Sequence, residues 1–243
     1  MLIKDIIAKI ENFAPVELAS EWDNTGWQVK LDIKETDKIL LALSPSPDVV
    51  EQAKKLGCGL IIIHHPLFMG KITKLTPENF TCKTAIEAIR NNIQIYSAHT
   101  NLDKVQGGIN DVLAEKFGLK NVEIIGEFVR TGMVESLSVK DFALRVKEIL
   151  GCEKVKLINT AGVEIVSKVA LCSGSGMDLV NSFEADIFIT GDVKYHNAIE
   201  VLDKAVLDVG HFESERVILP VLKELLCGVE VFIADEKDPW KII

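Results

Sequence analysis

The chain has 243 residues, of which 48% are hydrophobic and 26% are charged, and its formal net charge is −9. This length and composition suit one large α/β domain or two smaller lobes with a substantial core, and they argue against extensive disorder. The acidic balance disfavours non-specific nucleic-acid binding, because phosphate contacts need clustered cations.

The cysteines and the apolar segments narrow the cellular context. The five cysteines are scattered and never spaced as CxxC, so the pattern predicts neither a disulfide framework nor a cysteine-based zinc site. The N-terminal segment MLIKDIIAKIENF carries charges throughout and lacks the apolar stretch of a signal peptide. The longest apolar runs, such as residues 60–63, are too short to span a membrane. We therefore expect a cytoplasmic protein.

Hydrophobic periodicity predicts an amphipathic helix at the N-terminus and then alternating strands and helices. The predicted helices cover residues 2–13, 48–56, 84–91, 109–117 and 139–150, and the clearest predicted strands cover residues 38–43, 60–63 and 93–97. Ser138 is expected to cap the helix that runs to Leu150. Short apolar strands separated by helices favour α/β layers around a mostly parallel sheet.

The second half of the chain echoes the first. Residues 85–89 (AIEAI) match residues 198–202 (AIEVL), and upstream the Ser-rich turn at 43–47 corresponds to residues 172–176. Each copy is followed by a strand that ends in a histidine, with a carboxylate four residues later. Because these matches are collinear, they indicate a diverged duplication with the same order of elements in both halves.

A duplication predicts two α/β lobes of similar topology. We expect the first lobe to span residues 1–125 and the second to span residues 126–243. Two such lobes would pack about a pseudo-two-fold axis. The polar ends of strands from both would then meet in a ligand-binding cleft.

Two adjacent histidines, His64 and His65, directly follow the buried strand at 60–63 and precede Pro66. A hydrogen-bonded pair of structural histidines is one interpretation. However, the chain has only five histidines, and two of them stand together at the carboxyl end of a core strand. We therefore favour metal ligation by both imidazoles.

The segment 96–103 (YSAHTNLD) carries His99 and Asp103 at the next polar strand end. Asp103 offers an anionic oxygen that can bind or bridge divalent metals, although alone it would also fit an Asx-turn or a helix cap. Its correspondence with Glu215 in the second half favours ligation. His99 fits either a partner that orients a metal ligand or a core histidine.

The segment 208–215 (DVGHFESE) carries the third set of polar residues. If a helix opens near Ser214 and runs to Leu226, His211 and Glu215 lie near its N-terminus, where the helix dipole favours a carboxylate. Glu213 is an alternative ligand that spacing alone does not exclude.

Three imidazoles and two carboxylates suit zinc, manganese, iron or cobalt better than calcium or magnesium. Five ligands exceed the needs of one tetrahedral ion, and they suit a pair of divalent ions that support hydrolysis. His196, at the start of the predicted helix in the second half, is a candidate acid–base or substrate-contact residue. A surface or capping role is the alternative for His196.

Five motifs occur in order along the chain: EWDNTGWQV, IIIHHPLF, YSAHTNLD with GGIND, TGDVKYHNA and DVGHFESE. Together they resemble the Nif-three-like family, whose members are often labelled GTP cyclohydrolase 1 type 2 homologues, and the resemblance spans nearly the whole chain. It implies two interlinked α/β lobes with two divalent metals in the cleft between them, and a toroidal hexamer. The matching ligand positions are His64, His65, Asp103, His211 and Glu215, so the resemblance selects Glu215 over Glu213.

The leading functional hypothesis is a metal-dependent hydrolase that acts on a nucleotide. The resemblance implies opening of the guanine ring of GTP, whereas phosphoester hydrolysis fits the same metal pair equally well. His196 and His99 are the candidate acid–base residues. The alternative is a non-enzymatic metal-binding scaffold that binds DNA or a regulatory protein.

Overall fold

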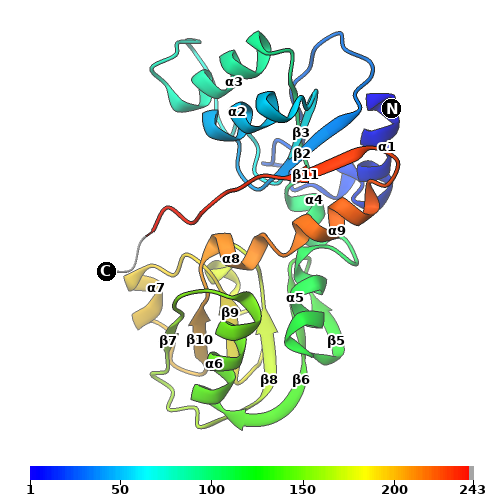
Figure 1. The fold of residues 1–243 in the computed structure, drawn as a ribbon. Helices are drawn as coiled ribbons and strands as arrows, with labels where there is room; N and C mark the ends of the chain where they lie inside the picture. The colour runs from blue at the N-terminus through cyan, green and yellow to red at the C-terminus, as the bar shows by residue number, and fades with distance from the viewer. Residues whose placement is uncertain (241–243) are drawn as a thin grey trace. The chain divides into compact units, whose positions relative to one another are not determined.

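The structure, a computed structural model, describes residues 1–240 of the chain. It divides into two compact units, of which the first comprises Met1–Val105 with Ile218–Lys237 and the second comprises Gln106–Val217 with residues 238–240. Each unit contains one β-sheet and its own helices, so the protein has a mixed α/β fold with two sheets (Figure 1). In the part of the chain that is described, no helix is long and apolar enough to cross a membrane.

The first unit is built on a sheet with strand order β1-β4-β3-β2-β11. Its strands are β1 (Gly26–Val29), β2 (Lys38–Ala42), β3 (Leu60–Ile63), β4 (Gln94–Ser97) and β11 (Glu230–Ile233). Its helices are α1 (Ile3–Phe13), α2 (Pro47–Leu56), α3 (Phe80–Arg90), α4 (Thr100–Lys104) and α9 (Ile218–Leu225). Strands β4, β3, β2 and β11 run parallel, and β1 pairs antiparallel with β4.

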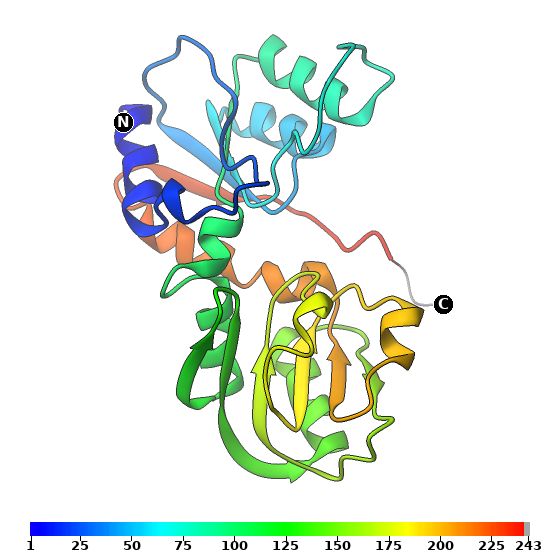
Figure 2. The ribbon, with the colours of Figure 1, turned by 180° about the vertical axis from the view of Figure 1, so that it is seen from behind.

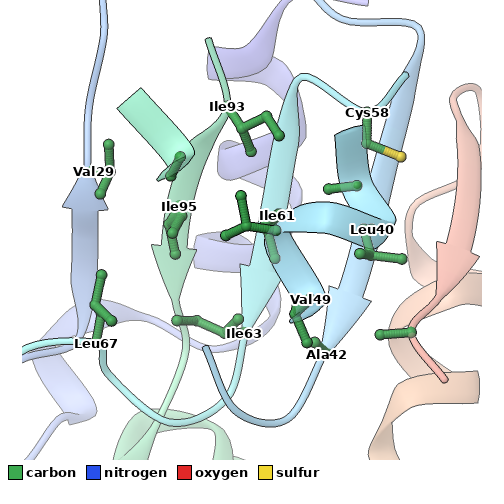
Figure 3. Packing of buried hydrophobic residues seen from close by; sticks show 14 of the residues in the cluster. Val29, Leu40, Ala42, Val49, Cys58, Ile61, Ile63, Leu67, Ile93 and Ile95 are labelled. Atoms are coloured by element: carbon green, nitrogen blue, oxygen red, sulfur yellow. The ribbon is translucent and has the colours of Figure 1, made fainter. Parts of the chain in front are cut away.

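Helices cover both faces of this first sheet. Figures 1 and 2 show α2 and α3 on one face and α1 and α9 on the other. Strand β3 is buried at all four positions, as expected of a strand that is covered on both sides. Figure 3 shows the core beneath α2, where Leu40, Ile61 and Ile95 from three neighbouring strands pack with Val49.

Helix α2 shows how local sequence signals set an element's boundaries. The Ser46 side chain accepts a hydrogen bond from the backbone N–H of Val49 at 3.1 Å, which caps the N-terminus. Pro47 occupies the first turn, where its missing N–H has no consequence. Gly57 ends the helix in the left-handed conformation, with a φ of 74°.

The parallel pairing brings the carboxyl ends of β2, β3 and β4 to one edge of the first sheet. Ala42 pairs with Ile63, and Ile63 pairs with Ser97. The chain leaves these strand ends into the segments that carry Ser44, the adjacent histidines and His99. Polar side chains from three separate segments are therefore collected at this edge.

The second unit is built on a sheet with strand order β5-β6-β8-β9-β10-β7. Its strands are β5 (Lys120–Ile125), β6 (Val129–Ser138), β7 (Lys156–Ile158), β8 (Ile165–Leu171), β9 (Ile187–Thr190) and β10 (Ala205–Asp208). Its helices are α5 (Ile109–Phe117), α6 (Val139–Leu150), α7 (Tyr195–Ile199) and α8 (His211–Glu215). The predicted cap is confirmed, because Ser138 accepts a hydrogen bond from the backbone N–H of Asp141 at 3.1 Å.

Strands β8, β9 and β10 form the parallel part of the second sheet. Leu171 pairs with Ile189, and Thr190 pairs with Asp208, so these three strands also end at one edge. The turns that follow carry Gly174, Asp192 and His211. The other three strands are antiparallel to their neighbours.

Three consecutive parallel strands thus occur in each unit, at the positions that the sequence echo relates, but the intervening helices differ. Only a 3₁₀ turn at Met177–Leu179 stands where the first unit has α2. The helix expected over residues 198–202 ends at Ile199. The chain turns there because Val201 is buried in the core and its carbonyl accepts a hydrogen bond from Thr160 Oγ1.

The single helix expected to run to Leu226 was a wrong prediction, because two helices occupy this region. Helix α8 ends at Glu215, and α9 begins at Ile218. Pro220 explains the break, since it has no N–H to donate and its ring would clash with the carbonyl of Arg216 in a continuous helix. The break also separates the two units, so α8 belongs to the second and α9 to the first.

Candidate metal centre

His64 and His65 leave strand β3 with their rings held through Nδ1. The backbone N–H groups of both residues continue the pairing with the chain after β2, at 3.2 and 2.8 Å. His64 Nδ1 donates to the carbonyl oxygen of Ala98 at 2.9 Å, and His65 Nδ1 is hydrogen-bonded to Ser44 Oγ at 2.8 Å. Because Nδ1 is engaged in both rings, metal coordination would use Nε2.

Ser44 is itself fixed by a residue distant in sequence. The Glu236 carboxylate, which follows β11, accepts hydrogen bonds from the backbone N–H groups of Leu43 at 2.6 Å and Ser44 at 2.9 Å. The two oxygens thereby hold the turn that presents the Ser44 hydroxyl to His65.

His99 joins the pair from the end of β4. Its ring centroid lies 5.1 Å from that of His64 and 5.8 Å from that of His65. Its Nδ1 lies 2.7 Å from Asp23 Oδ1. One ligand-capable atom from each of the three histidines lies within 4.8 Å of the others, so this triad can hold a metal ion.

Asp103 lies beside this triad on the short helix α4. The side chain is largely buried, and its Oδ1 lies 3.8 Å from His64 Nε2. The helix begins directly after His99, so that one turn returns Asp103 toward the histidines. The first unit therefore collects three imidazoles and one carboxylate.

In the second unit, His211 and Glu215 stand one turn apart on helix α8. Their Nε2 and Oε1 atoms are 3.0 Å apart, and Glu215 is 4% exposed. Asp192 Oδ2 lies 2.7 Å from His211 Nδ1 and so fixes the ring from its other side. Burial alone would lower the pKa of His211, but the hydrogen bonds and negative charges of Glu215 and Asp192 raise it to about 9.

Two glycines allow the backbone to approach the His211–Glu215 pair. A Cβ at Gly174, where φ is 60°, would lie 2.3 Å from Glu215 Oε1 and 3.2 Å from His211 Nε2. A Cβ at Gly191 would lie 2.7 Å from the backbone nitrogen of His211. Only residues without a side chain fit these positions.

The other second-unit candidates lie elsewhere. The Glu213 carboxylate folds over Gly210, where a Cβ would meet Oε2 at 2.3 Å, whereas Glu215 makes the contact with His211. His196 is exposed on α7, and its ring packs against the neighbouring Tyr195 at 5.4 Å between centroids. Among the described residues, His196 belongs to neither cluster.

A family model for Duf34/NIF3 (NGG1p interacting factor 3) matches residues 1–239. The chain belongs to the Duf34/NIF3 family. The Clostridium perfringens protein named GTP cyclohydrolase 1 type 2 homolog is 35% identical, and the match covers 100% of both chains. The structure of reduced HcgD from Methanocaldococcus jannaschii, 33% identical, matches 97% of this chain and 98% of that one, with a TM-score of 0.87. A NIF3-related protein from Bacillus cereus has the same fold, with a TM-score of 0.94 at 22% identity over 100% and 99% of the two chains.

The donors in this Duf34/NIF3 protein fit a divalent transition metal. Imidazole nitrogens combined with carboxylate oxygens are the ligands that zinc, manganese, iron and cobalt accept. Each of the four histidines described above has its Nδ1 occupied by a separate partner, which is how proteins orient metal-binding imidazoles. The glycine at position 174 also keeps the space beside Glu215 clear of side-chain atoms.

The sequence of this Duf34/NIF3 protein did not predict the contacts that three supporting residues make with the histidines. Ser44, Asp23 and Asp192 each hold the Nδ1 of one histidine. Asp23 and Asp192 lie inside the motifs EWDNTGWQV and TGDVKYHNA, which was the available signal. The hydrogen-bond partner of each could not be assigned without the fold.

Proposed function

We propose that this chain is a divalent-metal-dependent hydrolase that acts on a nucleotide. In this proposal two divalent ions are held by His64, His65, Asp103, His211 and Glu215. The observation that carries the proposal is the orientation of the imidazoles through Nδ1, which prepares Nε2 atoms and carboxylate oxygens for metal.

The metal type follows from the donors. Zinc, manganese, iron and cobalt are all compatible with mixed nitrogen and oxygen ligands, and the choice among them is left to metal analysis. When bound, a pair of such ions would acidify water and neutralise negative charge that develops on the substrate.

The chain's own residues would complete the chemistry by moving protons. His99 is the stronger candidate, because it lies within the histidine cluster and has a buried carboxylate partner in Asp23. His196 remains a second candidate for contact with substrate, since it is exposed in the first turn of the short helix α7.

The substrate class rests on the names of relatives. The Clostridium perfringens relative is named a GTP cyclohydrolase 1 type 2 homolog, which supports a purine nucleotide whose ring is opened by water. Hydrolysis of a phosphoester is the second reaction that suits the same donors. The sequence has no Walker-type phosphate loop, so phosphate recognition would come from the metals and from scattered cations.

We further propose that the chain assembles with itself as a toroidal hexamer, as the family resemblance implies. The formal net charge of −9 makes nucleic acid a disfavoured partner. A non-enzymatic scaffold is the alternative function, and the description NGG1p interacting factor 3 in the family's name favours it.

The test begins with metal-quantified protein loaded with Mn²⁺, Zn²⁺, Fe²⁺ or Co²⁺. A panel that includes GTP and model phosphodiesters is assayed for turnover. We expect turnover that disappears in Glu215→Ala and His65→Ala, whereas the matched exposed variant Glu224→Ala retains it. Turnover that survives in Glu215→Ala, or no turnover by fully metallated protein, would overturn the hydrolase proposal.

The metal assignment has its own measurement. Wild-type protein is expected to bind two divalent ions per chain, and His65→Ala and Glu215→Ala are each expected to weaken that binding. Elemental analysis after equilibrium dialysis gives the stoichiometry. Two ions held at wild-type affinity by both variants would show that these residues are not ligands.

A further inference from the structure

The segment before β1 contains a carboxylate whose surroundings are unusually well defined. The side chain of Asp23 is completely buried, although the residue lies in a turn. The burial alone would raise its pKa, but hydrogen bonds from His99, Thr100 and Thr25 outweigh it and hold the pKa well below the usual range. Asp23 is therefore a buried anion.

Each oxygen of Asp23 is assigned by its partners. Oδ1 lies 2.7 Å from His99 Nδ1 and accepts the backbone N–H of Asn24 at 2.7 Å. Oδ2 accepts the backbone N–H of Thr100 at 3.0 Å and the hydroxyls of Thr100 at 2.5 Å and Thr25 at 2.9 Å. Backbone donors on both sides prevent the carboxylate from rotating.

The turn that carries Asp23 is anchored at further points. The Ser20 backbone N–H donates to Thr100 Oγ1 at 2.9 Å, and the Asn24 side chain donates to the carbonyl of Phe68 at 2.6 Å. The ring of Trp22 meets the His99 ring edge-on at 6.0 Å between centroids. The turn is thus fastened to the segments that follow β3 and β4, which carry the histidine cluster.

We propose that Asp23 is a positioning residue that fixes the proton of His99 on Nδ1 and presents His99 Nε2 to whatever the His64–His65 pair binds. The role at the reaction rests on the proposed function, but the orientation of the ring does not. A carboxylate accepts and cannot donate, so the bonded Nδ1 must carry the proton. The remaining ring nitrogen of His99, Nε2, is free to contact a group bound by His64 and His65. The ring centroids of these two histidines lie 5.1 and 5.8 Å from that of His99.

The variant Asp23→Asn tests this with little change in volume. An asparagine supplies one acceptor oxygen, whereas the backbone N–H groups of Asn24 and Thr100 require an acceptor on each side. Because Oδ2 serves three donors and Oδ1 only two, we expect the amide nitrogen at the Oδ1 position, where it donates to His99 Nδ1 instead of accepting from it. Asp32→Asn, at an exposed position in the same unit, is the matched control.

The first readout is the tautomer of His99 in metal-free full-length protein, measured by long-range proton–nitrogen NMR and assigned with His99→Gln. Wild-type protein and Asp32→Asn are expected to show one His99 tautomer, with the proton on Nδ1. Asp23→Asn is expected to show a mixture or the opposite tautomer. A wild-type His99 with its proton on Nε2 overturns the proposal, and this outcome does not depend on whether Asp23→Asn folds.

The second readout is a Zn²⁺ titration followed on the same nitrogen signals. We expect the Nε2 signal of His99 to move with those of His64 and His65 in wild-type protein, and to respond differently in Asp23→Asn. Signals of His64 and His65 that move while His99 stays unchanged would overturn the proposed role of Asp23. If none of the three moves, the metal-binding proposal fails, while the tautomer result still decides the orientation of His99.

Discussion

Asp192 lies 2.7 Å from the Nδ1 of His211 while its own backbone adopts the left-handed conformation, with a φ of 53°. Few residues other than glycine occupy this region, and aspartate and asparagine tolerate it better than most. Strain of this kind persists where the surrounding structure imposes it, often at functional sites. The conformation directs a carboxylate at the ring that is proposed to bind metal.

The variant Asp192→Ala is expected to lower divalent-metal affinity by about 10- to 100-fold, because it removes the group that orients the His211 ring. Asp192→Asn retains both an acceptor oxygen and tolerance of the backbone conformation, so it should keep most of the affinity. Isothermal titration calorimetry with Zn²⁺ compares the two. Equal affinities for Asp192→Ala and the wild-type chain would show that Asp192 does not support a ligand.

Two serines separated by one residue should give opposite results. Ser44→Ala removes the hydrogen-bond partner of His65, and we expect about a 10-fold loss of metal affinity with little change in the free energy of unfolding. Ser46→Ala removes the cap of α2, and we expect it to lower the free energy of unfolding by about 1 kcal/mol with metal affinity retained. Denaturant titration and calorimetry on both variants test this contrast, and a loss of metal affinity in Ser46→Ala alone would contradict it.

Two glycine-to-alanine variants distinguish the effect of backbone strain from that of a steric clash with Glu215. Gly174 and Gly162 have φ values of 60° and 67°, so alanine should strain both by about 1 kcal/mol. Only at Gly174 would the new Cβ collide with Glu215 Oε1, since nothing lies within 4 Å at Gly162. We expect Gly174→Ala to lose metal binding and Gly162→Ala to retain it. Similar metal affinity in both variants would contradict the close approach at Gly174.

The cysteines should differ sharply in their reactivity. Burial raises the pKa of the Cys58 thiol to about 11, whereas Cys227 is exposed. Because the thiolate is the nucleophile, iodoacetamide at pH 8 should modify Cys227 in the native protein and leave Cys58 unmodified, with both reacting in urea. Mass spectrometry locates the label, and rapid native labelling of Cys58 would contradict its burial.

The same pKa shift gives a direction for stability at high pH. The folded-state pKa of Cys58 lies above its ordinary value of 9.0, so the unfolded chain loses this proton first. The contribution of Cys58 to folding is therefore complete below pH 9 and declines as the pH rises toward about 11. Comparison with Cys58→Ala by denaturant titration across this range checks the sign.

The elements that the sequence predicts well are those with strong local signals. Helix α5 matches its predicted range of residues 109–117, and the Ser138 cap is present, because capping and helical periodicity are properties of neighbouring residues. The helix predicted to run past Ser214 to Leu226 is interrupted because Pro220 breaks it, and the apolar pattern alone does not reveal this break. The helix predicted over residues 198–202 ends early because Val201 is buried in the core, and the similarity to residues 85–89 does not reveal that tertiary contact.

The hydrogen-bond partners that hold the candidate metal ligands in place could not be predicted from the sequence. Adjacent histidines at a strand end are a local signal, and they were identified as such. The pairing of Asp23 with His99 joins residues 76 positions apart, and the Glu236 contact with Leu43 joins residues 193 positions apart. Such contacts depend on strand order, which spacing along the chain does not encode.

Strand β11 and Glu236 also determine when the first unit can be finished during synthesis. Residues 106–217 form most of the second unit from one continuous segment, whereas the first unit needs residues 218–237 to cover the open side of β2 and to hold the Ser44 turn. As the chain emerges from the ribosome, the second unit can therefore fold before the first is complete. His65, although translated early, therefore gains the Ser44 turn that holds its Nδ1 only after Glu236 has been synthesised.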